Sequence, residues 1–428
     1  MKVIKGFEAA KAALSREVPA EALPDLEERE QTVRQILSNV RRQGDAALFH
    51  YTLKFDGVEL ATLEVAREQI AHAYRQVDAG LVQALKLAAE RIGAFHTRQR
   101  ERLLAEATES GLGWLIRPLR RVGVYAPGFT APLPSSVLMS VIPARVAGVK
   151  EVVLVTPPGA GGAVAPITLV AADIAGVDRI FSVGGAQAIA ALAYGTESIP
   201  RVDKVCGPGN IFVLLAKKLL YGVVGIDGLY GPSEVVIIAD DTANPQHCAA
   251  DLLAQADHDP LASAILITTS PSLADRVSQA LKQQLSSLSR RAIAAQSLEK
   301  RGMIVVVASV EEAIELANRY APEHLCLVVD RAASYVEQVL NAGCLFVGEH
   351  SVEALVDYVA GPSHVLPTEG TARFSSPLNV TDFVKLISLV NMDEASLREL
   401  GPAAATIARA EGLDAHARAV ERRQDSSS

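Results

Sequence analysis

Residues 151–195 read EVVLVTPPGAGGAVAPITLVAADIAGVDRIFSVGGAQAIAALAYG, and within them two short apolar runs are each followed by a glycine turn and an alanine-rich stretch. The runs EVVLVT and RIFSV are mainly apolar and do not alternate with polar residues, which is typical of strands that are buried on both faces of a parallel sheet. The alanine-rich stretches have the length and composition of helices. Strands that alternate with helices predict a parallel sheet covered by helices, so this segment predicts an α/β fold.

The same alternation extends along the chain in both directions. It begins after Gly111 with RVGVYAP and SSVLMSVIPARVAG, and a second series, from EVVIIAD to CLFVGE, follows GPSE. We therefore expect two α/β units in one chain. Before them, Asp25 and Glu28 predict a capping box at the start of a helix that Gly44 ends. After Pro377 the pattern is that of a helical tail that runs to the C-terminus.

Composition limits the class of protein. The 41 basic and 49 acidic residues give a net charge of −8, which argues against general affinity for nucleic acid or for anionic membranes. The N-terminal segment has scattered charges and no apolar core, so a signal peptide is not expected, and no apolar run is long enough to span a bilayer. Four cysteines without CxxC pairing favour a reduced, cytoplasmic protein; they are Cys206, Cys248, Cys326 and Cys344.

Glycine turns follow several of the predicted strands. GAGGAV, residues 159–164, lacks the third glycine and the later acidic residue of a dinucleotide fingerprint, so we interpret it as a surface turn. VGGAQ and CGPGN end in amides, Gln187 and Asn210, that we expect to be exposed at the carboxyl edge of the sheet. Their backbone N–H groups can face an anion, and the alternative is that both are simply tight turns between a strand and a helix.

In YAPEHL, Glu323 stands directly beside His324 at the start of the predicted strand LCLVVD. A carboxylate next to an imidazole offers two proton acceptors of different basicity, which suits a reaction with two proton transfers. The alternative is a structural loop that caps a helix. In AQADHDP, Gln255 and His258 are three residues apart and share one face of a helix end. They are either a solvated polar terminus or two ligand atoms aimed at one target.

Two more motifs hold a carboxylate and an imidazole close together in the sequence. Asp357 and His364 lie in the loop HSVEALVDYVAGPSHVLPT, which is rich in glycine and proline, and segments of this kind often carry function. Glu411 and His416 flank a helix start in the segment EGLDAHARAV of the tail. The residues themselves do not decide whether these pairs act together.

Seven segments resemble histidinol dehydrogenase, in order and with similar spacing: VYAPGFTAPLPSSVLM, VGGAQAIAALAYGTESIPRVDKVCGPGN, GPSEVVIIAD, LLAQADHDP, YAPEHL, YVAGPSHVLPT and AEGLDAHARAV. The resemblance covers the chain from the first helix to about residue 423. It implies two incomplete Rossmann-like α/β domains with parallel sheets flanked by helices. The implied parts are an N-terminal arm (1–22), a larger α/β domain with most of the site (23–124 and 235–378), an NAD-binding α/β domain (125–234) and a helical tail (379–428).

The resemblance also implies the chemistry, which is the NAD-dependent oxidation of L-histidinol to L-histidine through bound L-histidinaldehyde, in the last steps of histidine biosynthesis. It implies one zinc ion per subunit of a homodimer, and the implied ligands are Gln255, His258, Asp357 and His416 of the partner subunit. Two imidazoles with oxygen donors suit a borderline cation that keeps room for substrate. Gln255 and His258 would then share a helix face because both reach one metal.

The resemblance assigns roles within the site. His324 is implied as the base in both oxidations, and Glu323 as the base that activates water for the second. The implied NAD contacts are Tyr125, Gln187 and Asn210. The implied substrate contacts are Ser233, Gln255, His258, His324, Asp357, Glu411 and His416.

Three positions depart from the family pattern. Phe129 stands where a second glycine commonly follows YxPG, and Val352 and Val356 replace a proline and a glycine. Valine adopts a positive φ only at a cost, so we expect an altered loop around Asp357 if that glycine served the backbone. The alternative functions are a related dehydrogenase of another polar primary alcohol, such as a sulfonated diol, and a non-catalytic zinc-binding protein. The retained Glu411 and the intact YAPEH argue against both.

Overall fold

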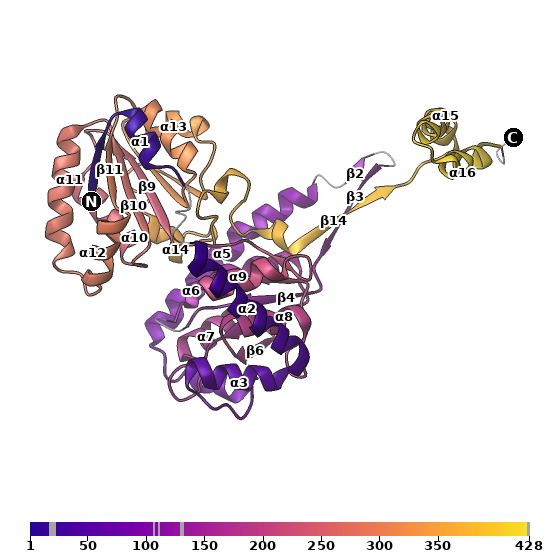
Figure 1. Ribbon diagram of the computed structural model, residues 1–428, viewed down its shortest axis with the longest axis horizontal. Coiled ribbons are helices and arrows are strands. Elements are labelled where there is room, and N and C mark those ends of the chain that lie inside the picture. The colour runs from indigo at the N-terminus through magenta and orange to yellow at the C-terminus, as the bar shows by residue number, and fades with distance from the viewer. Residues whose placement is uncertain (17–22, 106–107, 110–111, 129–131, 426–428) are drawn as a thin grey trace. The chain divides into compact units, whose positions relative to one another are not determined.

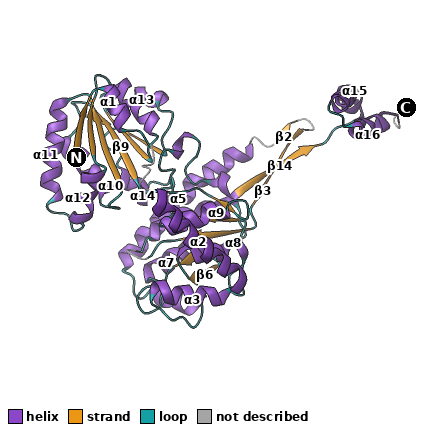
Figure 2. Ribbon diagram, in the orientation of Figure 1, coloured by secondary structure: helices purple, strands orange, loops and turns teal. Residues whose placement is uncertain are grey.

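The computed structural model describes residues 1–428 apart from 17–22, 106–107, 110–111, 129–131 and 426–428. The chain divides into two compact units, and each is described by itself. Unit 1 is Met1–Gln99 with Leu119–Phe383, and unit 2 is Arg100–Pro118 with Val384–Ser428. Unit 1 contains two separate parallel sheets with helices around them (Figures 1 and 2). The predicted α/β fold with parallel sheets flanked by helices is therefore confirmed.

Sheet A of unit 1 has six parallel strands. Their order is β1 (Lys2–Lys5), β11 (Met303–Val306), β10 (Ser263–Thr268), β9 (Glu234–Ala239), β12 (His324–Val328) and β13 (Cys344–Val347). On one face lie α10 (Pro245–Ala256), α11 (Pro271–Leu285) and α12 (Arg291–Lys300), and on the other lie α1 (Phe7–Ala13) and α13 (Val310–Tyr320). Val235 and Ile237 of β9 join the first core, whereas Val236 and Ile238 join the second. This alternation explains why the strand is apolar at every position after Glu234.

Sheet B of unit 1 has five parallel strands. Their order is β6 (Arg179–Ser182), β5 (Glu151–Thr156), β4 (Arg121–Tyr125), β7 (Lys204–Cys206) and β8 (Gly225–Ile226). The helices that connect them are α6 (Pro134–Ala147), α7 (Pro166–Ala175), α8 (Gly185–Tyr194) and α9 (Ile211–Leu220). GAGGAV is a turn after β5, as predicted. Because all strands are parallel, Tyr125 at the end of β4 marks the carboxyl edge of this sheet.

The N-terminal helices differ from the expected domain boundary. We expected residues 23–124 to accompany 235–378, but α2 (Leu23–Gln43) and α3 (Asp45–Asp56) share a core with sheet B, α8 and α9. The apolar face of α2 packs into this core, which holds α2 and α3 against sheet B. α4 (Arg67–Ala73) contacts α7. α2 begins at Leu23, so Asp25 lies inside the helix, where it pairs with Arg29 at 2.9 Å instead of forming the predicted capping box.

Unit 2 corrects the prediction that strands stop after Pro377. Residues 384–390 form the strand β14 (Val384–Val390), which pairs antiparallel with β3 (Leu112–Pro118), and β2 (Thr108–Glu109) extends this sheet. The partner strand comes from far earlier in the chain, so no local turn signal announces the pairing. Two helices follow, α15 (Glu394–Ala410) and α16 (Asp414–Asp425), so the rest of the predicted helical tail is present.

The remaining helices and 3-10 turns link the segments described above. They are α5 (Ala79–Ala105), α14 (Glu353–Tyr358) and the 3-10 turns η2 (Ala332–Gln338), η3 (Thr371–Arg373) and η4 (Val380–Phe383). Among the helices of the described residues, none is both long enough and apolar enough to cross a membrane.

Candidate active site

The Glu323–His324 pair lies at the amino edge of sheet A, where β12 begins. Tyr320 ends α13, and Ala321 takes a left-handed conformation, with φ of 50°, that turns the chain toward the strand. Both members of the pair are buried. Glu323 Oε2 accepts a hydrogen bond from the backbone N–H of Glu234 at 2.9 Å, and His324 Nδ1 donates to the carbonyl oxygen of Glu234 at 3.1 Å. The pair is therefore held by one residue of the neighbouring strand β9.

Burial is the largest influence on Glu323 and raises the pKa of its carboxyl group well above the usual range. Hydrogen bonds from the Glu234 backbone and from the Ser233 side chain lower this pKa, whereas the carboxylates of Glu234 and Asp357 raise it. Positive charge brought near Glu323 would favour its carboxylate. Ser233, a predicted substrate contact, thus lies directly beside the pair.

His324 is held as a neutral imidazole. Burial lowers its pKa to about 3, against the hydrogen bond to the Glu234 backbone, and His258 and His364 lower it further. Because Nδ1 carries the proton that Glu234 accepts, Nε2 has a free lone pair, and this atom is buried without a hydrogen-bond partner among the described residues. Glu353 Oε1 lies 3.7 Å from Nδ1. The neutral ring therefore has its one free acceptor atom at Nε2.

Two of the three predicted metal ligands of unit 1 act electrostatically on this pair, His258 on His324 and Asp357 on Glu323. Gln255 is fully buried in the last turn of α10, and neither of its amide atoms has a hydrogen-bond partner in the described part of the chain. His258 follows the same helix, and burial lowers its pKa. Asp357 lies in α14, and burial raises its pKa to about 6. A buried amide with both atoms unpaired is costly, so these donors fit a cation.

The described residues do not complete a metal site by themselves. No group of three or more His, Cys, Asp or Glu side chains among them is arranged to hold a metal ion. The two predicted residues of the tail belong to unit 2, where both are exposed: Glu411 ends α15 and His416 lies in the first turn of α16. The fourth predicted ligand, His416, therefore belongs to unit 2 and not to the unit that holds Gln255, His258 and Asp357.

His364 and Ser136 are further polar groups beside the site. His364 Nδ1 donates to the carbonyl oxygen of Asp357 at 2.8 Å, and Nε2 lies 3.3 Å from the hydroxyl of Ser136 in α6. Burial lowers the pKa of His364 to about 4. Sequence reasoning missed Ser136, Glu353 and Glu234, although all three lie inside motifs that it quoted. Serine and glutamate are common in surface loops, so these residue types did not indicate that the three positions belong to the site.

The three predicted NAD contacts lie at the carboxyl edge of sheet B. Tyr125 is buried at the end of β4, its hydroxyl accepts from Gly185 N–H at 3.3 Å, and burial raises its pKa to about 12. The expected exposure of Gln187 is wrong, since it is 1% exposed in the first turn of α8. Asn210 is exposed but caps α9, accepting from two backbone N–H groups at 3.1 and 3.2 Å.

The positions that depart from the family pattern do not distort the backbone. Val356 is helical within α14, and Val352 is extended, with φ of −76°. Among the described residues only Ala321, Arg331 and Glu369 take a positive φ without being glycine. Neither valine is therefore forced into a positive φ, which was the reason to expect an altered loop around Asp357. Phe129 lies outside the described residues.

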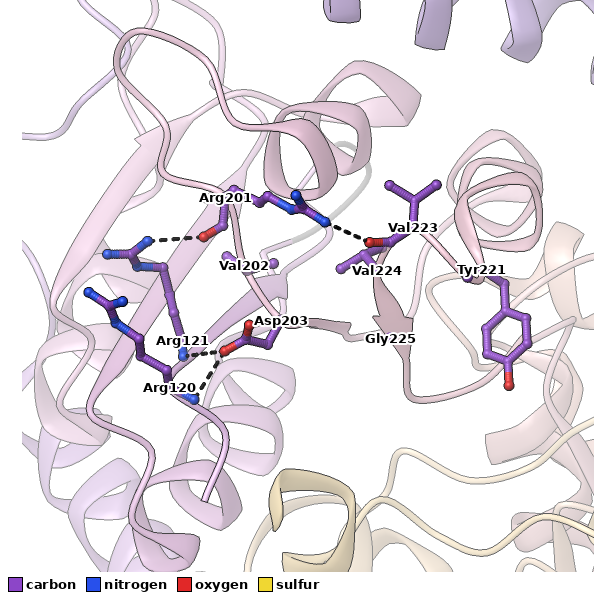
Figure 3. Close-up of a pocket in the computed structure, with 10 residues that line it drawn as sticks. Arg120, Arg121, Arg201, Val202, Asp203, Tyr221, Val223, Val224 and Gly225 are labelled. Atoms are coloured by element: carbon purple, nitrogen blue, oxygen red, sulfur yellow. Dashed lines mark hydrogen bonds between the residues drawn. The ribbon is translucent and has the colours of Figure 1, made fainter. Parts of the chain in front are cut away.

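A separate cavity of about 610 Å³ lies where the strands of sheet B begin (Figure 3). Arg120, Arg121 and Arg201 line it, and Asp203 accepts from the backbone N–H groups of Arg120 and Arg121 at 3.0 Å. None of the predicted site residues lines this cavity. It is therefore no part of the candidate active site.

The parallel sheets and the buried carboxylate–imidazole pair are the features of an α/β enzyme with candidate acid–base groups. The model of the histidinol dehydrogenase family matches residues 21–424. The chain belongs to the histidinol dehydrogenase family. It is an oxidoreductase that acts on the small molecule histidinol in histidine biosynthesis. The alternative substrate, another polar primary alcohol, is not favoured by these matches.

Individual relatives agree with this assignment. The chain is 55% identical over 434 residues to a histidinol dehydrogenase of Dehalococcoides mccartyi (strain CBDB1), covering 99% of this chain and 100% of that one. It is 51% identical to the enzyme of Deinococcus radiodurans, over 99% and 100% of the two chains. The crystal structure of histidinol dehydrogenase from Elizabethkingia anophelis is 36% identical and superposes with a TM-score of 0.92, over 100% of this chain and 98% of that one.

Proposed function

We propose that this enzyme performs the NAD-dependent four-electron oxidation of L-histidinol to L-histidine through an L-histidinaldehyde that stays bound. The observation that carries the proposal is the arrangement of Glu323 and His324 on the main chain of Glu234. One neutral imidazole with a free Nε2 and one separate carboxyl group suit two proton acceptors with different tasks. Two successive oxidations at one carbon need both proton acceptors.

His324 and Glu323 divide the proton transfers. His324 Nε2 takes the hydroxyl proton of the alcohol while the carbon gives up a hydride, and the aldehyde results. Glu323 then takes a proton from water as the water oxygen bonds to the aldehyde carbon, and protonated His324 returns its proton to the carbonyl oxygen, which gives the hydrate and restores the neutral imidazole. His324 takes a proton from this hydrate as the second hydride leaves, and the product is the carboxylic acid. Burial, which raises the pKa of Glu323, makes its carboxylate the stronger base.

Zinc and NAD are the cofactors we propose, with one zinc ion per subunit. Gln255, His258, Asp357 and the partner subunit's His416 would hold the metal, and the unpaired amide of Gln255 supports this. Bound zinc supplies a Lewis acid that orients the nitrogens of the substrate, and bound NAD accepts the hydrides. Tyr125, Gln187 and Asn210 would contact NAD, and Glu411 of the partner subunit would contact substrate together with Ser233.

A homodimer with shared sites is supported by unit 2. The buried hydrophobic cluster of its helical pair consists, among the described residues, of Ala405, Ala408 and Ala417. Larger apolar side chains are exposed instead, including Val390 at 64% and Ile407 at 59%. Exposed apolar surface of this kind indicates a missing partner chain. The four cysteines are free, which supports a reduced, cytoplasmic setting.

Separate assays of the two oxidations test the division of labour. We expect Glu323→Gln to oxidise histidinol to the aldehyde at close to the normal rate but to slow histidinaldehyde oxidation about 100-fold or more, because only the second step consumes water. His324→Asn should slow both steps. NADH formation is followed with each substrate supplied alone.

Glu64→Gln is the control, since Glu64 pairs with Arg179 at the edge of sheet B and has no contact with the pair. Its rates should match those of the wild type. Equal damage to both steps by Glu323→Gln would contradict the assigned roles.

A further inference from the structure

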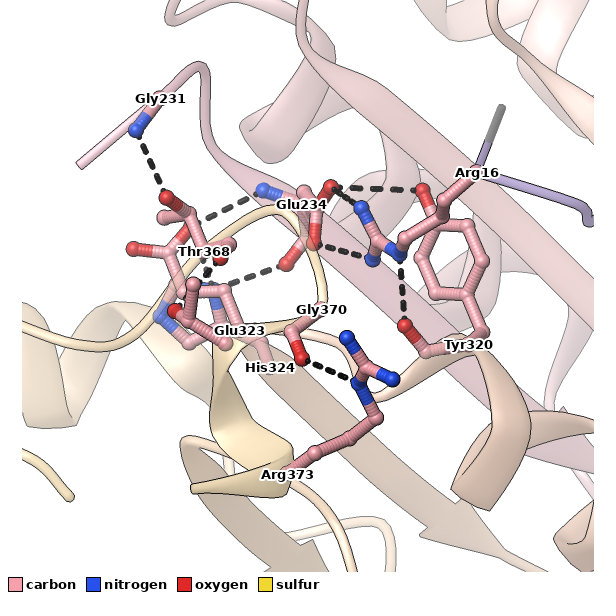
Figure 4. A network of polar contacts seen from close by, with 10 residues as sticks. Arg16, Gly231, Glu234, Tyr320, Glu323, His324, Thr368, Gly370 and Arg373 are labelled. Carbon is pink, nitrogen blue, oxygen red and sulfur yellow. Dashed lines mark hydrogen bonds and ion pairs between the residues drawn. The ribbon is translucent and has the colours of Figure 1, made fainter. Parts of the chain in front are cut away.

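Glu234, the first residue of β9, holds both members of the Glu323–His324 pair through its main chain (Figure 4). Its N–H donates to Glu323 and its carbonyl oxygen accepts from His324. The placement of this one residue therefore sets the direction of both functional groups. Its own side chain is 2% exposed, so the carboxylate of Glu234 needs a partner inside the protein.

Arg16 is that partner. Its Nη1 and Nη2 atoms donate to the two carboxylate oxygens of Glu234 at 2.6 and 2.7 Å, the two-pronged geometry of the strongest arginine–carboxylate bonds. Its Nε donates to the carbonyl oxygen of Tyr320 at 2.7 Å, and its guanidinium lies 3.7 Å over the Tyr320 ring. Tyr320 ends α13, just before the Glu323–His324 pair. Arg16 thus joins both segments that build the pair.

The positive charge of Arg16 is required to balance the buried negative charge of the Glu234 carboxylate. Without it, the buried carboxylate of Glu234 would face the carboxyl group of Glu323 with no positive charge to offset either. A buried charge that loses its partner shifts toward water or takes up a proton, and both changes move the group that carries it. The main chain of Glu234 would move with its side chain, and with it the hydrogen bonds to the pair.

We propose that Arg16 is a positioning residue, which holds Glu234 and, through the main chain of Glu234, keeps Glu323 and His324 in their working geometry. This proposal rests on the proposed roles of Glu323 and His324. It extends the active site to the N-terminal arm, although Arg16 contacts neither of the two side chains directly.

The variant Arg16→Ala tests the proposal. We expect kcat for histidinol to fall about 10- to 100-fold, the range found for residues that orient a functional group. The KM for histidinol should change less than about twofold, because no substrate contact is lost. Guanidinium ion at low concentration should restore part of kcat by entering the space left by the side chain. Urea, its neutral analogue, should not.

The double variant Arg16→Ala with Glu234→Gln separates charge from packing. It leaves no buried carboxylate unpaired, so kcat should recover to within about fivefold of the wild type. Arg179→Ala is the matched control. Arg179 also binds a glutamate with two nitrogens, at 2.8 and 2.7 Å, and lies 4.9 Å over an aromatic ring, that of Phe181. It belongs to sheet B, and its loss should leave kcat unchanged.

Each outcome supports or overturns the positioning role of Arg16. Full kcat in Arg16→Ala overturns the positioning role, and so does a loss that equals the loss of folded protein and that guanidinium does not relieve. Failure of the proposed function has a different signature, since it requires His324→Asn to remain active in both oxidations. If His324→Asn is inactive and Arg16→Ala is fully active, only the role of Arg16 is refuted.

Discussion

At the scale of single residues, the burial of Gln255 has no explanation within the folded chain alone. Both amide atoms of Gln255 are unpaired in the described structure, and each such group costs about 1–3 kcal/mol. A metal ion that accepts the amide oxygen removes part of this cost. If Gln255 binds the proposed zinc ion, we expect the metal-free protein to be less stable than the zinc-bound protein.

The metal prediction concerns His258→Asn. We expect zinc affinity to fall by more than about 100-fold, since even changes behind a ligand cost 10- to 100-fold, while the fold persists. Zinc content after dialysis against a metal buffer measures this. His247→Asn is the control, because His247 lies in the same helix α10 but is exposed and bonds to Glu349. If His258→Asn retained zinc at the normal affinity, His258 would not be a zinc ligand.

A pH prediction concerns His96, which is fully buried in α5 and donates from Nδ1 to Gln99 at 2.7 Å. Burial lowers its pKa. Below about pH 6.5 the unfolded chain therefore binds a proton that the folded chain does not, and stability falls as the pH drops. The expected slope is at most about 1.4 kcal/mol per pH unit.

His96→Gln should remove this slope. Urea unfolding of the metal-free protein at several pH values between about 5 and 7.5 measures it. In both proteins the buried carboxyl groups near the site titrate with the opposite sign, and His324 and His364 titrate with the same sign as His96, so only the difference between the curves is informative. Parallel curves for the two proteins would show that His96 is not the responsible group.

At the scale of elements, the sequence predicts those strands whose partners and covering helices are complete. β9 and β5 read as uniformly apolar runs because both faces are buried, and this composition is visible in the sequence. β1 and β14 could not be predicted in the same way. β1 is four residues long and is a strand because the edge of β11 is free to pair with it. β14 is largely exposed.

The candidate site shows the same limit. Glu323, His324, Gln255 and Asp357 could be found because their side-chain types are rare in apolar surroundings. Glu234 could not, since it acts on the pair through its main chain, and every residue has an N–H and a carbonyl group. Asn210 was predicted for its amide, but the sequence could not show that the same amide caps α9.

The loop pattern around Asp357 gives a prediction at the scale of α14. Val356 is helical and packs at the edge of a core, so Val356→Gly should lower the free energy of unfolding by about 2 kcal/mol, from helix propensity and lost packing. Val352→Pro should be neutral, since Val352 precedes the helix with φ of −76°. Denaturation midpoints of the two variants test this. Greater stability of Val356→Gly would indicate a strained backbone there.

At the scale of the whole molecule, the shared site predicts complementation between inactive chains. His258→Asn and His416→Asn chains are mixed and allowed to exchange subunits. If His416 serves the partner's metal, each heterodimer has one intact site, and activity should return to about a quarter of the wild-type value with random pairing. A mixture that stays inactive after verified exchange would show that each chain builds its own site.

The control for this experiment pairs His258→Asn with Asp357→Asn. Both residues belong to unit 1, so every site in their heterodimer lacks one ligand whichever chain supplies His416. This mixture should stay inactive. Recovery of activity here would mean that unit 1 itself exchanges ligands between chains.

The pairing of β1 with β11 has a consequence for biosynthesis of the chain. The same N-terminal arm also carries Arg16, which bonds to Tyr320, 304 residues further along the chain, so the arm leaves the ribosome long before its docking place exists. At about 5–20 residues per second, the arm waits for roughly 15–60 s. Sheet B, whose strands lie between Arg121 and Ile226, can assemble during that interval. The edge of sheet A that β1 forms can close only after β11 has been made, and Arg16 can act on Glu323 and His324 only when more than three quarters of the 428 residues have been translated.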